Sequence, residues 1–583
     1  MIEKFVIGRD YRVCMVDGEV VAVSERIPPY VIGNGISTVR QLINKLNKDE
    51  RRGRGHEKPL TKIKMNEALT AYISKYGYLL TTVLQQGVKL TLRENANLST
   101  GGIAIDCTEL ICEENIEICN RTAKAIGLNI CGIDICCKDI SIPLKEGGAI
   151  IEVNAAPGIR MHHYPYSGKS RNVAGAIVDM MFKDVESSIP IVSVTGTNGK
   201  TTTARLIAHT LTLKGHNVGM TTTGGIYVNN KCIHKGDTTG YLSAMTLLMN
   251  KEIDAVVLET ARGGIIKKGL AYDLADVAVI TNITEDHLWL GGINTLEELA
   301  GVKSLVGEAV KSDGYVVLNA DDKMSRTIVE RMKSKIIFFS MDKDNDLLRD
   351  NINYGGYGIY PMNGYIYVEK DGNGVPLGKI NNICITLKGK LKYNIENSMA
   401  ACASLVGLGV DYATIRKGLT SFQSNEEQNP GRFNMYCVNG ATVILDYGHN
   451  IEGYKAVLEG ANSIKHKSFI GIIGVPGDRL DSNIFQVASI AGSYFDYLYI
   501  KEDEDKRGRK PGEVAKLLEK GVASSGNTNY EIVINEKDAL EKAIDNSKPG
   551  DLIIIFFEKF EPLVKLVKDK IKCEEEQVIA TVG

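Results

Sequence analysis

Residues 191–208 carry the most recognisable chemistry in this chain. An apolar run predicted to be a strand leads into Gly196-Thr197-Asn198-Gly199-Lys200-Thr201-Thr202, and a stretch with helical periodicity follows. The glycines allow backbone N–H groups to face phosphate oxygens, the helix N-terminus adds partial positive charge, and Lys200 adds a full charge. Thr201 supplies the hydroxyl that holds Mg²⁺ in loops of this type. Although its G-x-x-G-K-T spacing is shorter than the commonest form, the pattern predicts a site for the phosphates of ATP or a close relative.

Polar groups also follow two other predicted strands. The strand expected at 255–259 ends in Glu259, and the next one leads to Asn282, Asp286 and His287. Because ligands bind at the carboxyl ends of strands in open α/β sheets, we expect these side chains near the phosphate loop. Each alone could be a helix cap or a surface group. Together, after a phosphate loop, they predict magnesium ligands around a transferred phosphoryl group.

A third polar group precedes the phosphate loop. Glu152 and Asn154 lie two positions apart at the end of a predicted strand, so their side chains face the same side. Asp134 belongs to the preceding strand. Any one of the three could be an ordinary polar residue at a strand end. Three oxygen ligands that converge in this way predict a site for Mg²⁺ between ATP phosphates.

Several domains must position these residues, because 583 residues are too many for one hydrophobic core. The pattern changes after residue 187 and again near residue 428, so we expect domains at 1–187, 188–427 and 428–583. Strand-sized apolar runs alternate with helical stretches, which is typical of an α/β fold. Strands are expected at 130–135, 149–153, 191–195, 255–259, 277–282, 316–319, 336–339, 442–446, 469–473, 497–500, 531–534 and 552–556, with a helix near 116–125.

The composition argues against several classes of protein. A formal charge of −2 gives no electrostatic reason to expect nucleic acid or an anionic membrane as partner. The twelve cysteines form no C-x-x-C pair, and we interpret them as buried thiols of a cytoplasmic protein. The first ten residues contain charges where a signal peptide would be apolar, and the apolar runs are too short to span a bilayer.

Six segments occur in an order that is typical of one family. They are Thr195-Gly-Thr-Asn-Gly-Lys-Thr-Thr202, Leu258-Glu-Thr-Ala-Arg-Gly-Gly264, Asn282-Ile-Thr-Glu-Asp-His-Leu288, Leu318-Asn-Ala-Asp-Asp322, Pro430-Gly-Arg432 and Asp446-Tyr-Gly-His-Asn450. These segments resemble the ordered motifs of the Mur ligase superfamily. The resemblance implies a central P-loop α/β domain followed by a C-terminal Rossmann-like α/β domain that closes over it. Gly448 and Ile451 depart from the family pattern without removing a catalytic group.

The resemblance also implies roles for individual residues. Lys200 would contact the β- and γ-phosphates of ATP, and Thr201 would bind Mg²⁺. Glu259 and His287 would hold a second Mg²⁺ near an acyl phosphate. Lys303 stands where the family has a lysine that is often carbamylated, and an ordinary lysine on a helix surface is the rival interpretation.

Three further residues would complete the nucleotide site according to the same resemblance. Asn397 matches the asparagine on the adenine side, and Arg432 and Asp446 match contacts from the C-terminal domain to phosphate and ribose. The chemistry expected of such a site is amide formation. A carboxylate is a poor electrophile, so phosphoryl transfer first converts it into an acyl phosphate that an amine can attack.

The first domain carries a second resemblance. The segments Leu92-Arg-Glu-Asn-Ala-Asn-Leu-Ser-Thr-Gly-Gly102, Gly132-Ile-Asp134 and Ile150-Ile-Glu-Val-Asn-Ala-Ala-Pro-Gly158 resemble the C-terminal part of an ATP-grasp enzyme. A partial ATP-grasp domain joined to a Mur-ligase-like module is similar to the cyanophycin synthetase family. That resemblance implies that arginine is joined to the aspartate β-carboxylates of a poly-aspartate primer, with aspartate added at the ATP-grasp centre. Arg93, Arg160 and His162 would contact substrate.

The front of the chain departs from that family. The sequence begins where the last part of an ATP-grasp fold would begin, and Glu3 would match a ribose-binding glutamate. We therefore expect the aspartate-adding centre to be inactive in this polypeptide alone, and either completed by a separately encoded half or part of a truncated reading frame. We expect a homo-oligomer. The alternatives are another Mur-superfamily amide ligase, of the folylpolyglutamate or cell-wall peptide type, and a non-catalytic subunit.

Overall fold

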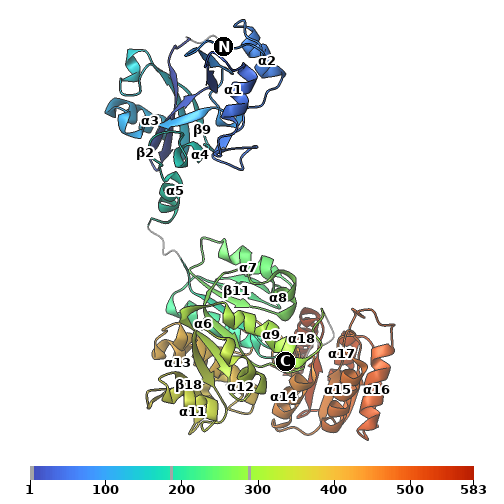
Figure 1. The fold of residues 1–583 in the computed structure, drawn as a ribbon. Helices are drawn as coiled ribbons and strands as arrows, with labels where there is room; N and C mark the ends of the chain where they lie inside the picture. Colours follow the sequence, from blue (N-terminus) through green and yellow to red (C-terminus); the bar gives the residue numbers. More distant parts are fainter. Residues whose placement is uncertain (1–4, 184–187, 286–290, 583) are drawn as a thin grey trace. The chain divides into compact units, whose positions relative to one another are not determined.

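The structure is a computed structural model that describes residues 5–183, 188–285 and 291–582, with side chains described up to residue 572. The chain divides into two compact units, Met1–Ser187 and Ser188–Gly583, and each is described here by itself (Figure 1). Within the described residues, no helix is both long enough and apolar enough to cross a membrane. Glu3 lies outside the described residues.

The first unit contains a five-stranded antiparallel sheet with the order β7-β2-β1-β8-β9. One face of β1 packs Tyr11, Val13 and Met15 against α3, and the opposite face packs Cys14 and Val16 against α5. This alternation follows from the two-residue period of a strand. The bounds are β1 Arg9–Val16, β2 Glu19–Ile27, β7 Ile103–Asp106, α3 Glu113–Ile126, β8 Ile130–Cys137, β9 Ala149–Asn154, α4 Arg160–His163 and α5 Val173–Phe182.

A smaller lobe is inserted between β2 and β7 and has its own apolar core, which contains Ile43, Leu69 and Ile73. Its two helices begin at side-chain caps: Thr38 forms a capping box with Gln41, and the Asn66 side chain accepts from the N–H of Leu69. The bounds are β3 Tyr30–Ile32, α1 Val39–Leu46, β4 Arg52–Gly53, β5 Leu60–Thr61, α2 Glu67–Ser74 and β6 Lys89–Thr91.

The second unit begins with an eleven-stranded sheet in the order β13-β12-β11-β14-β10-β15-β16-β17-β18-β19-β20. The strands from β11 to β18 along this order are parallel, and α6 and α12 cover one face while α8 to α11 cover the other. The strand bounds are β10 Ile191–Thr195, β11 Val218–Thr222, β12 Gly225–Val228, β13 Lys231–Lys235, β14 Ala255–Glu259, β15 Ala275–Ile280, β16 Val310–Asn319, β17 Lys335–Phe339, β18 Tyr357–Met362, β19 Tyr365–Lys370 and β20 Asn373–Lys379. The helix bounds are α6 Lys200–Lys214, α7 Tyr241–Leu248, α8 Arg262–Lys268, α9 Leu296–Glu308, α10 Lys323–Ile328, α11 Asp346–Asn353, α12 Lys392–Gly407 and α13 Tyr412–Ser421.

A six-stranded sheet completes this unit in the order β21-β22-β26-β23-β24-β25, with only β21 antiparallel. Helices α14 to α16 pack on one face, and α17 and α18 pack on the other. The bounds are β21 Asn434–Val438, β22 Ala441–Asp446, α14 Ile451–Asn462, β23 Phe469–Ile473, α15 Asp481–Tyr494, β24 Tyr497–Ile500, α16 Glu513–Ser524, β25 Tyr530–Ile532, α17 Glu536–Asn546, β26 Leu552–Phe556 and α18 Phe560–Val582.

The predicted α/β class is confirmed, and each predicted strand is present, with ends that differ by a few residues. One such difference is at β15, which ends at Ile280 rather than at Asn282. The strand stops early because Thr281 and Asn282 turn their side chains to the backbone of Asn198. The division of the second unit near residue 428 stays a prediction.

Candidate functional site

The loop between β10 and α6 has the geometry of a phosphate site. Gly199 stands at the N-cap of α6 with φ +85°, and its position has room for no Cβ, which would lie 2.1 Å from Oδ1 of Asn397. The close approach of Asn397 therefore requires glycine here. No side chain caps this helix, so the N–H groups of its first turn are available to an anion.

Two lysines hold the loop by its carbonyl groups. Lys200 Nζ donates to the carbonyls of Gly196 (3.1 Å) and Thr197 (2.9 Å). Lys303 on α9 is only 4% exposed, and its Nζ donates to the Gly196 carbonyl at 2.6 Å. The interpretation of Lys303 as an ordinary surface lysine is therefore wrong, because burial against the phosphate loop places its amine inside the site.

A carboxylate and two hydroxyls meet beside the loop. Glu259, at the end of β14, is 1% exposed, and the Thr201 hydroxyl lies 3.1 and 3.0 Å from its two oxygens. The backbone N–H of Thr223 donates to Glu259 at 3.1 Å, and the Thr201 and Thr223 hydroxyls are also 3.1 Å apart. Oxygen donors of this kind suit a hard cation such as Mg²⁺.

Thr223 was not predicted from the sequence. Its position follows from strand register, because β11 runs parallel to β14 with Thr221 opposite Leu258. Thr222 is thus level with Glu259, and the next residue, Thr223, donates its N–H to the carboxylate. His287 and Asp286 lie outside the described residues, so their predicted metal role stays a prediction. Among the described residues, no three His, Cys, Asp or Glu side chains form a metal cluster.

The C-terminal part of the unit reaches the same loop. Arg432 donates from Nη2 to the Thr201 hydroxyl at 3.2 Å and stacks over the Tyr447 ring. The side-chain amides of Asn198 and Asn450 exchange two hydrogen bonds of 3.2 and 3.0 Å. The phosphate loop is therefore contacted directly by the second sheet domain.

Asp446, at the end of β22, is buried beside this contact. Its oxygens accept from the N–H groups of Phe433 and Gly448, both at 2.8 Å. Burial raises the pKa of Asp446 to about 6, although Arg432 and the two N–H donors oppose this shift.

The remaining predicted residues lie close by. Asn397 donates to the Asn394 side chain at 3.0 Å, and Thr202 lies against Asn429. Apart from His287, the residues predicted for the central nucleotide site thus gather around one loop.

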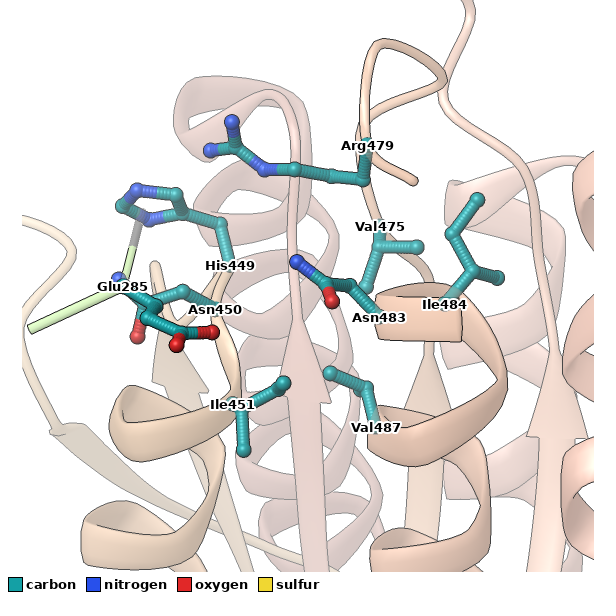
Figure 2. A pocket seen from close by; sticks show the side chains of 9 residues that line it. All are labelled: Glu285, His449, Asn450, Ile451, Val475, Arg479, Asn483, Ile484 and Val487. Carbon is teal, nitrogen blue, oxygen red and sulfur yellow. The ribbon is translucent and has the colours of Figure 1, made fainter. Parts of the chain in front are cut away.

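A narrow pocket lies between the two sheet domains of this unit (Figure 2). Glu285 contributes from the central domain, and His449, Asn450 and Arg479 contribute from the C-terminal domain. Figure 2 shows an apolar group on the opposite side of the pocket from Arg479, formed in part by Ile451 and Val487. Asn450 connects this pocket to the phosphate loop through its bonds to Asn198.

The predicted ATP-grasp residues lie on one sheet of the first unit. Asp134 is opposite Glu152 in the register of β8 and β9, and the Asn154 amide donates to Glu152 at 3.0 Å, so the three share a face. Asp134 is buried, and Arg12 binds both of its oxygens while Arg26 binds Oδ2 at 3.0 Å. A metal ion at Asp134 would have to displace a guanidinium group. The assignment of Mg²⁺ to these three residues stays a prediction.

Arg12 and Arg26 were missed, although alternation on β1 and β2 places them on the same face as Asp134. The three predicted substrate contacts are held by other groups. His162 is 1% exposed and lies 2.9 Å from the Ser24 hydroxyl, and burial lowers its pKa to about 4. Arg160 donates to the Lys58 carbonyl, and Arg93, which lines an open pocket, donates to Asn66.

Comparison with known proteins gives a consistent result. Residues 194–405 match the Mur ligase middle domain, and residues 431–556 match the Mur ligase, glutamate ligase domain. The chain is 43% identical over 571 residues to the cyanophycin synthetase of Synechocystis sp., which covers 97% of this chain and 65% of that protein. It thus spans about two thirds of the length of that relative.

Two other similarities are partial. The glutathione biosynthesis bifunctional protein GshAB of Clostridium perfringens is 39% identical over 183 residues, which is 31% of this chain and 24% of that protein. The structure of E. coli FolC in complex with DHPP and ADP matches 66% of this chain and 89% of FolC, with a TM-score of 0.50 and 20% identity. The FolC match supports the fold alone.

Proposed function

The chain belongs to the Mur ligase family, and from this premise we propose that it is an ATP-dependent ligase that forms an amide through an acyl phosphate. The observation that carries the proposal is the meeting of Lys200, Thr201 and Glu259 at the start of α6, with Arg432 supplied by the second sheet domain. This set combines a phosphate loop, a buried carboxylate and a positive charge from the second sheet domain.

Each group of the site would have a distinct role. The N–H groups of the first turn of α6 and the ammonium of Lys200 bind the phosphates of ATP and stabilise the charge of the transferred phosphoryl group. Thr201 and Glu259, with the Thr223 hydroxyl beside them, would hold Mg²⁺, which neutralises phosphate charge when bound. Closure of the second domain over the loop excludes water, which would otherwise hydrolyse the acyl phosphate.

The substrates follow from the similarity to cyanophycin synthetases. A relative 43% identical over almost the whole chain favours arginine as the incoming amine and a poly-aspartate primer as the acid. The pocket between Glu285 and Arg479 adjoins the phosphate loop through Asn450, so we propose that the amine approaches the carboxyl group from this side. A cytoplasmic location, a homo-oligomeric state and a separately encoded ATP-grasp half stay predictions.

A substrate comparison tests this proposal. The purified chain is incubated with ATP, Mg²⁺ and one acceptor–amine pair at a time, and the products are weighed by mass spectrometry. We expect poly-aspartate with arginine to gain whole arginine residues. If no arginine is added to poly-aspartate, but an amino acid is added to folate or to a UDP-linked peptide, the chain would instead belong to another branch of the Mur ligases.

A further inference from the structure

Three loops meet at the carboxyl edge of the second sheet domain. They follow β23 (474–480), β24 (501–512) and β26 (557–559). The first loop carries Val475 and Arg479, which line the pocket between the two sheet domains (Figure 2). The position of this pocket wall therefore depends on what holds the three loops together.

Arg509 binds the pocket loop by its backbone. Its guanidinium donates to the carbonyls of Gly477 and Arg479, at 2.7 Å each, and to the Asp481 carboxylate at 2.7 Å. A fourth contact, to Glu513 at 2.8 Å, anchors the guanidinium to the start of α16. The planar Arg509 guanidinium bonds the carbonyls on either side of Asp478. It therefore fixes the direction in which the Arg479 side chain leaves the loop.

Lys501 holds the loop that carries Arg509. It is 1% exposed, and its Nζ lies 2.6 Å from Asp503 and 2.8 Å from Glu536. Its methylene stem packs on Gly474, where a Cβ would lie 2.4 Å from Lys501 Cε. The pocket loop, the loop after β24 and the start of α17 are therefore joined by one lysine side chain.

The third loop is tied to the same centre. The Glu536 carboxylate also accepts from the N–H groups of Glu558 (2.6 Å) and Lys559 (3.0 Å). Glu558 in turn accepts from the N–H of Glu504 at 2.5 Å. A buried ion group of this kind is poor evidence for stability, because desolvation offsets much of its Coulomb energy. A role in fixing geometry explains its presence better.

We propose that Arg509 and Lys501 are positioning residues that hold the Arg479 wall of the pocket in the geometry that receives the incoming amine. The inference rests on the proposed function of that pocket. Neither residue lines the pocket, so each would act through the backbone of the 474–480 loop.

Steady-state kinetics on the full chain test the proposal. For R509M, we expect KM for arginine to rise at least about tenfold, because charged hydrogen bonds to two carbonyls are lost. KM for ATP should stay within about twofold, since the phosphate loop is untouched. R509K should fail to restore KM for arginine, because a lysine cannot span two carbonyls. K501M should raise the same KM if the variant folds.

Matched controls remove exposed ion pairs elsewhere. R331M breaks the pair with Glu308 in the central domain, and K542M breaks the pair with Glu531 in β25. Both should keep the wild-type KM for arginine. Folded R509M and R509K with wild-type KM for arginine would overturn the proposal. If the wild-type chain shows no arginine-dependent turnover at all, that result contradicts the proposed function. Failure of the positioning role alone would appear only in the variants.

Discussion

The Mg²⁺ site proposed at Glu259, Thr201 and Thr223 can be tested at the scale of single residues. If Thr201 and Glu259 hold Mg²⁺, E259Q should lower arginine-dependent ATP turnover at least about 100-fold, because a charge that stabilises the transition state is lost. T223V keeps the backbone N–H at Glu259 but removes the hydroxyl near Thr201. We expect it to lower turnover roughly tenfold and to raise the Mg²⁺ concentration required.

The control for this pair is T246V on α7, where the hydroxyl only bonds a carbonyl of its own helix. It should behave as wild type in the same magnesium titration. Full activity in E259Q at low Mg²⁺ would contradict the assignment of this carboxylate to the metal.

His162 gives a prediction about stability and pH. Its pKa of about 4 in the folded chain lies below the ordinary value of 6.5, because burial disfavours the imidazolium. Between these two values the unfolded chain binds more protons, so the free energy of unfolding rises with pH across this window. The full contribution, roughly 3 kcal/mol, is present above pH 6.5 and is lost as pH falls toward 4.

The measurement is chemical denaturation of wild type and H162Q at several pH values between 4 and 7, read from the transition of the first unit. The wild-type stability should climb with pH more steeply than that of H162Q. Parallel curves for the two proteins would show that His162 is not held neutral in the fold.

At the scale of elements, the start of α6 depends on one glycine. G199A would place a Cβ 2.1 Å from Asn397 Oδ1 at φ +85°, so either the buried Asn397 side chain must turn away or the phosphate loop must shift. We expect arginine-dependent turnover to fall at least about 100-fold, because displacement of the phosphate loop by an ångström misplaces the reacting groups.

The other end of α6 supplies the matched control. Gly215 also has positive φ, at +106°, but a Cβ there meets nothing within 4 Å. G215A should therefore cost only about 1 kcal/mol of stability and leave turnover near wild type. Equal losses of turnover in both variants would mean that backbone strain, rather than the contact with Asn397, accounts for the effect.

The sequence was most informative where strands are apolar and buried on both faces. β10, β14, β23, β24 and β26 have the predicted bounds, because each is a short apolar run in a covered sheet. The strands β18, β19 and β20 at one edge of the eleven-stranded sheet pair with one another in antiparallel fashion and were not predicted. The burial of Lys303 and the approach of Thr223 to Glu259 depend on the packing of α9 and the register of β11. Local patterns do not contain that information.

At the scale of the whole molecule, the second unit forms its site from two sheet domains. Asn450 and Arg432 from the C-terminal domain contact Asn198 and Thr201 of the phosphate loop. A ligase that forms an acyl phosphate needs such contacts. Closure of the C-terminal domain over the loop must keep water away from the acyl phosphate while the amine reaches it. ATP turnover should therefore be strongly coupled to arginine addition.

The most direct test of the central claim measures this coupling in wild type and K200A. Purified protein is incubated with ATP, Mg²⁺, arginine and poly-aspartate, and both ADP released and arginine incorporated are quantified. We predict close to one ADP per arginine in wild type, and loss of both products in a folded K200A. Undiminished arginine incorporation by K200A would contradict the account.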